Sequence, residues 1–256
     1  GSFASVNGVV SPAEEARVSI LDNGFTFGDA VYETLRTYGG RPFALDRHFA
    51  RLRLSASRLG ISIPQDDASL RGTLDELLAR AANPESFVRL IVTRGLGDIS
   101  YHFERVKGPT VVMAVKPFEG FPESSYTEGV PLALVSVRRN HRDALDPAIK
   151  SNNLLNNVLA VREAQAKGAV EGILLNQAGQ VAKQQAVTRQ CHRRPGLTAL
   201  ERLRLAEEVE TGGRGFQQAQ LAGIVHRKNQ IASDKKRSEA ERLTRTAGPN
   251  YFAVEA

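Results

Sequence analysis

The chain has 256 residues, of which 41% are hydrophobic and 24% charged, and its 34 Lys or Arg against 28 Asp or Glu give a net charge of +6. This length and balance suffice to bury a core in one or two domains, and no apolar run approaches the length of a membrane span. The single cysteine excludes a disulfide within the chain and indicates a reducing compartment, so we expect a cytoplasmic protein.

The first part of the chain predicts an α+β domain over residues 1–116. Apolar residues at helical spacing form two stripes, and β-branched or alternating runs surround them. The predicted helices are at about 45–59 and 68–81, and the predicted strands at about 4–10, 17–22, 30–38, 86–94 and 109–116.

Residues 117–129 predict a linker, because two prolines and a glycine near its start oppose regular structure. The second domain is then expected to cover residues 130–256. Its predicted elements are a buried strand at 130–137, a helix at 153–167, a strand at 171–176 and a turn at 177–179.

Lys150 is the most informative residue, because it lies between a polar loop and an apolar helix. The helix is expected to begin just after it, with Asn152 or Asn153 available as a cap. Burial of an amine disfavours its charged form, and the neutral amine is the nucleophile that forms a Schiff base with a carbonyl compound. The position therefore allows a lysine that reacts with a carbonyl cofactor or substrate, and the alternative from position alone is an ordinary solvated lysine.

Three blocks of sequence resemble the class IV aminotransferases, the fold type IV enzymes that use pyridoxal 5'-phosphate. Each block is weak evidence alone, but the three occur in the order found in that family. They are Asp22-Asn23-Gly24-Phe25-Thr26-Phe27-Gly28-Asp29-Ala30-Val31-Tyr32-Glu33-Thr34-Leu35-Arg36, His48-Phe49-Ala50-Arg51-Leu52-Arg53-Leu54-Ser55-Ala56 and Ile149-Lys150-Ser151.

The resemblance implies a two-domain α/β (α+β) fold, with a smaller N-terminal α+β domain and a larger C-terminal pseudo-barrel domain. It implies that the cofactor lies between the domains and that a homodimer partner completes the pocket. Lys150 matches the family's catalytic lysine, which binds the cofactor covalently, and Arg51 matches the arginine that binds the cofactor phosphate. A guanidinium suits that task because its planar fork forms two charge-assisted bonds to phosphate oxygens.

Three further residues match positions that bind substrate in the family. Tyr32 and Arg36 match residues on the strand lining the pocket, and Arg89 matches an arginine near the substrate carboxylate of branched-chain enzymes. The implied reaction moves an amino group between an amino acid, branched-chain-like, and a 2-oxo acid. D-amino-acid aminotransferase and aminodeoxychorismate lyase remain alternatives, because they share the lysine and the phosphate arginine.

The similarity breaks at Lys183, where the family places a glutamate that keeps the pyridine nitrogen protonated. Residues 1–182 contain 20 basic and 20 acidic residues, so residues 183–256 hold the remaining 14 and 8 and all of the net charge. We hypothesise that the reading frame is disrupted near Lys183, because one inserted base gives a glutamate, three further residues and then codons compatible with the family's Ser-Asn pair. One shift does not recover the hydrophobic block that follows in the family, so a second insertion or deletion, or coincidence, is the alternative. An intact natural gene encoding residues 176–195 as they stand would contradict the hypothesis.

Two hypotheses other than an active aminotransferase remain. The atypical segment 183–256 allows a protein that keeps the fold but is catalytically inactive. Its basic clusters, Arg227-Lys228 and Lys235-Lys236-Arg237, allow binding of a nucleic acid, although no aromatic platform accompanies them. The histidines show no metal-ligand spacing, so we expect no metal site.

Overall fold

The computed structural model describes residues 1–127 and 129–184. Contacts divide the chain into two compact units. The first comprises Gly1–Gly120 and Asn140–Leu155, and the second comprises, among the described residues, those of 121–139 and 156–184. The segment that carries Lys150, placed by the sequence in the second domain, therefore packs with the first unit. The boundaries at 116 and 130 remain a prediction.

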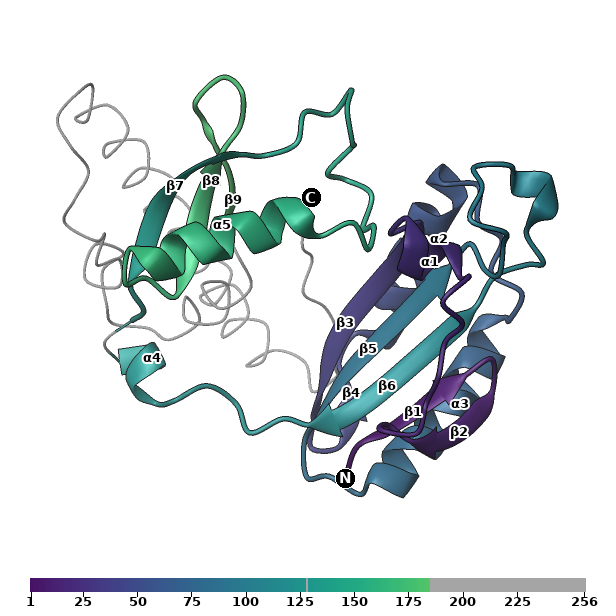
Figure 1. The fold of residues 1–256 in the computed structure, drawn as a ribbon. Helices are drawn as coiled ribbons and strands as arrows, with labels where there is room; N and C mark the ends of the chain where they lie inside the picture. Colours follow the sequence, from purple (N-terminus) through teal and green to yellow (C-terminus); the bar gives the residue numbers. More distant parts are fainter. Residues whose placement is uncertain (128, 185–256) are drawn as a thin grey trace, which may run out of the picture. The chain divides into compact units, whose positions relative to one another are not determined.

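The first unit is built on one six-stranded sheet with the order β2-β1-β6-β5-β3-β4 (Figure 1). All its neighbouring strands are antiparallel. The strands are β1 (Phe3–Val6), β2 (Val9–Pro12), β3 (Ala30–Tyr38), β4 (Arg41–Pro42), β5 (Ser86–Thr93) and β6 (Val111–Pro117).

Two helices, α2 (Leu45–Arg58) and α3 (Asp67–Ala81), lie on one face of this sheet (Figure 1). Their predicted stripes become the core, since Phe49, Leu52, Leu74 and Leu77 are at most 1% exposed. They pack against the inward residues of β3, β5 and β6. Both predicted helices and the strand at 30–38 are confirmed, and the opposite face of the sheet carries the alternate side chains.

Two predictions near the N-terminus were wrong. The single strand at 4–10 is a hairpin, because Asn7 and Gly8 have φ of 50° and 89° and turn the chain between β1 and β2. The strand at 17–22 is absent, and Val18 and Ile20 are exposed. Asp22 instead caps the short helix α1 (Asn23–Thr26), and its buried carboxylate accepts hydrogen bonds that hold this loop.

The second unit contains a three-stranded sheet of order β7-β8-β9. β7 (Leu132–Arg138) and β8 (Glu171–Leu175) are parallel, and the chain between them includes α5 (Leu155–Ala166). Ala160 and Ala164 of α5 are fully buried, and small side chains there let the helix approach the sheet closely. The predicted strands and helix are thus confirmed with shifts of one or two residues.

Two elements of this unit were missed: β9 (Val181–Gln184), which follows the turn at Gly179, and α4 (Ser124–Thr127), which lies inside the expected linker. Within the described residues the α/β class is confirmed, and none of the helices is long and apolar enough to cross a membrane. The basic clusters and the rest of the proposed barrel lie beyond residue 184, outside the described residues, and stay predictions.

Candidate functional site

The site forms at the start of β3, where one side of the strand is buried and the other is partly exposed. Residues of a strand point alternately to opposite faces. Val31 and Leu35 enter the core under the helices, and Glu33 points to the same side. Tyr32 and Thr34 lie on the other face, where they are partly exposed. A carboxylate thus occupies a row of apolar side chains, next to a tyrosine on the open face.

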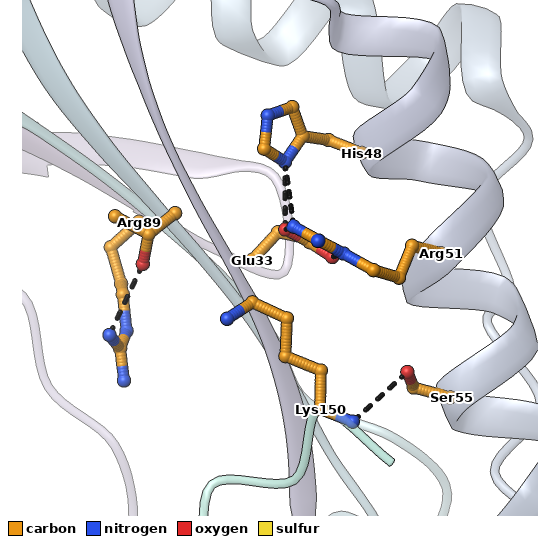
Figure 2. Close-up of polar contacts among 7 residues, drawn as sticks. Glu33, His48, Arg51, Ser55, Arg89 and Lys150 are labelled. Carbon is orange, nitrogen blue, oxygen red and sulfur yellow. Dashed lines mark hydrogen bonds and ion pairs between the residues drawn. The ribbon is translucent and has the colours of Figure 1, made fainter. Parts of the chain in front are cut away.

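Lys150 is fixed beside this strand by its backbone. Its carbonyl accepts a 3.0 Å hydrogen bond from Tyr32 N, and its own N–H donates to Ser55 Oγ of α2 at 3.2 Å (Figure 2). Asn152 N donates to Ala30 O at 2.7 Å, so the lysine segment pairs along the edge of β3. The Lys150 amine lies 4.0 Å from the centre of the Tyr32 ring. Hydrogen bonds therefore hold the backbone of Lys150, and its side-chain amine lies against the Tyr32 ring.

Arg51 is bound to Glu33 in a two-point ion pair. Its Nε and Nη2 donate to Oε1 and Oε2, each at 2.6 Å (Figure 2). His48, one turn earlier on α2, places Nδ1 2.7 Å from Glu33 Oε2. An ionised carboxylate only accepts hydrogen bonds, so Nδ1 carries a proton. The three side chains form a cluster in which Glu33 is fully buried and Arg51 is half exposed.

This cluster determines the charge of its members. Burial alone would raise the pKa of Glu33, but hydrogen bonds from Arg51 and His48 hold that pKa below its ordinary value. The Glu33 hydrogen bond in turn raises the pKa of Arg51. Glu33 is therefore an anion and Arg51 a cation at neutral pH.

Arg89 of β5 lies on the open face, directly opposite Thr34. It donates hydrogen bonds of 3.2 Å to Thr34 Oγ1 and Asn152 Oδ1, and its guanidinium stacks 3.8 Å from the Tyr32 ring. Burial lowers its pKa, although an arginine remains charged at neutral pH. Within the part of the chain that the structure describes, all partners of this cation are neutral, so an anionic ligand would complete its surroundings.

The structure brings together Lys150, Tyr32, Arg51 and Arg89 but not Arg36. Arg36 lies further along β3, where it stacks on the rings of Tyr38 and Phe118 at 4.1 and 4.3 Å. Its Nε donates to Thr37 O. These contacts belong to the far end of the strand. The substrate role expected for Arg36 stays a prediction.

Lys183, the point where the sequence departs from the family pattern, lies on β9 of the second unit. Its backbone pairs with Leu174 of β8. Over residues 1–127 and 129–184, no three His, Cys, Asp or Glu side chains gather where they could hold a metal ion.

Sequence reasoning missed Glu33, His48 and Ser55, although all three lie within the quoted blocks. Glu33 carried a usable signal, because a charged residue on the inward side of a buried strand needs a partner. His48 and Arg51 are three residues apart, so they share one side of a helix. Ser55 gave no signal, since only the fold reveals that its hydroxyl reaches residue 150.

Comparison with known proteins decides the family. The family model described as amino-transferase class IV matches residues 30–185, which is more than half of the chain. The chain belongs to the class IV aminotransferases. The match ends where the composition of the chain changes, just beyond Lys183.

Curated relatives named for branched-chain amino acids and others named for D-alanine are similar to this class IV aminotransferase. A Methanocaldococcus jannaschii protein, provisionally assigned as a branched-chain-amino-acid aminotransferase, is 36% identical over 178 residues, covering 70% of this chain and 61% of that protein. The D-alanine aminotransferase of Bacillus licheniformis is 35% identical over 169 residues, covering 66% and 58%. The chain thus spans about three fifths of the length of each of these two relatives.

Solved structures support the same assignment. The branched-chain aminotransferase of the archaeon Thermoproteus uzoniensis, solved with norvaline, is 29% identical and superimposes with a TM-score of 0.64, covering 72% of this chain and 63% of that one. A second branched-chain amino acid aminotransferase, solved with pyridoxamine 5'-phosphate, is 27% identical with a TM-score of 0.67, covering 71% and 62%. The predicted similarity to the fold type IV enzymes is therefore confirmed for the described residues, and a solved member of the family binds a form of the expected cofactor.

Proposed function

We propose that this class IV aminotransferase binds pyridoxal 5'-phosphate and moves an amino group between an amino acid and a 2-oxo acid. The observation that carries the proposal is the position of the Lys150 amine, 4.0 Å from the centre of the Tyr32 ring. Arg51 and Arg89 lie near Lys150 (Figure 2). One lysine and two arginines fit a ligand set that contains a carbonyl carbon, a phosphate and a carboxylate.

Arg51 supports phosphate binding by the shape of its contacts. Glu33 takes the edge formed by Nε and Nη2, and no described atom is hydrogen-bonded to Nη1. The guanidinium therefore has a second edge for an anion, and half of the side chain is exposed. This edge binds the cofactor phosphate.

Lys150 supplies the reactive amine. When bound, pyridoxal phosphate supplies an aldehyde carbon for the amine and a ring that accepts electrons from the substrate. With the cofactor bound, the Lys150 amine would hold or release a proton at Nζ, and Tyr32 and Ser55 hold the backbone from which this side chain extends. The Tyr32 ring limits the positions that the amine reaches.

Arg89 binds the carboxylate of the substrate. Thr34 and Asn152 orient its guanidinium, and both are neutral, so they leave the positive charge uncompensated. We propose a branched-chain amino acid as the donor, supported by the similarity to the Methanocaldococcus jannaschii and Thermoproteus uzoniensis proteins. A D-amino acid is the second candidate, supported by the Bacillus licheniformis relative.

Absorption spectra test the proposal. Purified protein is mixed with pyridoxal phosphate, and L-leucine, L-glutamate or D-alanine is then added separately. We expect the absorption of a lysine-bound cofactor to appear, to decrease with one amino acid, and to be absent in Lys150→Ala. Lys107→Ala, which removes an exposed lysine of the same unit, serves as the control and should match the unaltered protein.

Each other outcome has a defined meaning. Absorption that forms but does not respond to any amino acid would support the inactive alternative that Lys183 suggests. Absorption that persists in Lys150→Ala would refute the assignment of the lysine. If L-leucine has no effect and D-alanine decreases the band, the donor is a D-amino acid.

A further inference from the structure

Glu33 is a charged carboxylate at a position where burial costs free energy. It is 0% exposed and lies between Val31 and Leu35 on the core side of β3. Removing a charged carboxylate from water costs several kcal/mol, and partners compensate for this only with good geometry. Hydrogen bonds keep it ionised despite burial.

Stability alone does not account for this arrangement. Replacing a buried ion pair with apolar residues is often neutral or stabilising. Here Arg51 is also half exposed, so water can solvate its charge, and pairing with Glu33 adds little to the stability of the fold. The pair instead restricts the orientation of the guanidinium.

The geometry of the restriction is specific. Two parallel hydrogen bonds of 2.6 Å set both the plane and the direction of the Arg51 guanidinium. His48 Nδ1 bonds the same oxygen, Oε2, at 2.7 Å, and this third hydrogen bond opposes rotation of the carboxylate. A free arginine side chain loses rotamer freedom when it binds a ligand, and an arginine that is already ordered loses less.

We propose that Glu33, supported by His48, is a positioning residue that fixes Arg51 with its Nη1 edge outward for the phosphate group of the ligand. The inference rests on the proposed function, in which Arg51 binds that phosphate. Glu33 itself does not touch the ligand, because its side chain is fully buried and both of its oxygens are bonded to Arg51 and His48.

The test compares pyridoxal phosphate with pyridoxal, which lacks the phosphate. Both are titrated into the full chain, and Lys150→Ala provides the background from other amines. The dissociation constant of pyridoxal divided by that of pyridoxal phosphate measures how much the phosphate contributes to binding, and this quotient is the ratio used below. We expect Glu33→Gln to weaken pyridoxal phosphate roughly tenfold, ~1.4 kcal/mol, and to leave pyridoxal unchanged.

Two further variants separate positioning from a general loss of structure. In Arg51→Gln the ratio should fall close to one, and adding Glu33→Gln to it should have no further effect on the ratio. Asp67→Asn is the matched control, because it removes a carboxylate that lies 2.6 Å from Arg53, a residue of the same helix as Arg51. Its ratio should equal that of the unaltered protein.

The outcomes distinguish the two proposals. If the unaltered protein binds both compounds equally, the phosphate role of Arg51 in the proposed function fails, and this inference with it. If Arg51→Gln lowers the ratio but Glu33→Gln does not, or if Glu33→Gln weakens both ligands equally, only the positioning role is overturned.

A second measurement avoids dependence on a folded Glu33 variant. In the unaltered protein, the Arg51 Nε proton should exchange slowly with water in ¹⁵N-edited NMR spectra, because it is hydrogen-bonded to a buried carboxylate. Arg51→Gln assigns the signal by its loss. Exchange as fast as that of a solvated arginine would overturn the inference.

Discussion

At the scale of single residues, the site consists of cations whose surroundings differ. Arg51 is paired with a buried carboxylate, while Arg89 has only neutral partners among the described residues. Lys150 is held in place through its backbone, since its N–H and its carbonyl bond to Ser55 and Tyr32. Ser55 and Tyr32 therefore determine where the Lys150 side chain leaves the backbone.

Ser55→Ala tests this dependence. Ser55 is 2% exposed, and the substitution removes the acceptor for Lys150 N. We expect the free energy of unfolding to fall by about 1 kcal/mol and the Lys150 amide to exchange faster with solvent. Urea unfolding and hydrogen exchange measure the two effects. Ser57→Ala, an exposed serine on the same helix, should change neither; equal effects in both variants would contradict the role of Ser55.

At the scale of elements, α5 is tied to the sheet of the second unit by one acidic side chain. The Glu163 carboxylate accepts hydrogen bonds from Ser136 N and Oγ of β7, and from Lys167 Nζ one turn later. Burial would raise the Glu163 pKa, but these bonds, that of Lys167 first, lower it from 4.5 to about 2. The helix is thus held by a charge as well as by its alanines.

This contact predicts a pH dependence. A carboxylate with a lowered pKa in the folded state stabilises it above its unfolded pKa, and the contribution is lost as pH falls through the folded pKa. We expect Glu163→Gln to lower the free energy of unfolding by about 1 to 2 kcal/mol at pH 7, after allowance for screening at a partly exposed site.

Unfolding of both proteins by urea between pH 7 and pH 2 measures the difference. It should be constant above about pH 5 and shrink between pH 4.5 and pH 2, the window set by the two Glu163 pKa values. Glu76→Gln, which removes an exposed i,i+4 partner of Arg80 on α3, is the control and should change stability little. A difference that grows on acidification would refute the assignment.

At the scale of the whole molecule, the described chain has two units, and the family match ends at residue 185. The first unit has an apolar core between its sheet and its two helices, and it also holds Lys150, Tyr32, Arg51 and Arg89. The core that supports these residues is therefore local to one unit.

Leu77→Ala tests this support. Leu77 is fully buried in the core between α3 and the sheet. Its truncation should lower the free energy of unfolding by about 2 to 5 kcal/mol, through lost burial and the cavity left behind. Leu54→Ala, on the exposed side of α2, should cost well under half as much. Thermal and urea unfolding of the two variants would contradict the description if their losses were equal.

The sequence determined the elements that depend on local pattern. The stripes of α2 and α3 and the alternation of β3 were readable because side-chain direction repeats with helix or strand period. Three ordered blocks identified the family, and the resemblance, rather than its place after a polar loop, singled out Lys150. The hairpin at Asn7-Gly8 was also present in the sequence as a turn signal, but the run around it looked continuous.

Only the tertiary structure decided which of these residues meet. Glu33 and Arg51 are 18 residues apart, and Ser55 and Lys150 are 95 apart. Neither pairing follows from periodicity, because contacts at such separations depend on how helix, sheet and loop pack together. The same packing stacked the Arg36 side chain on Tyr38 and Phe118. It also placed the Lys150 segment with the first unit, since the free edge of β3 offered its backbone groups to residues 150 and 152.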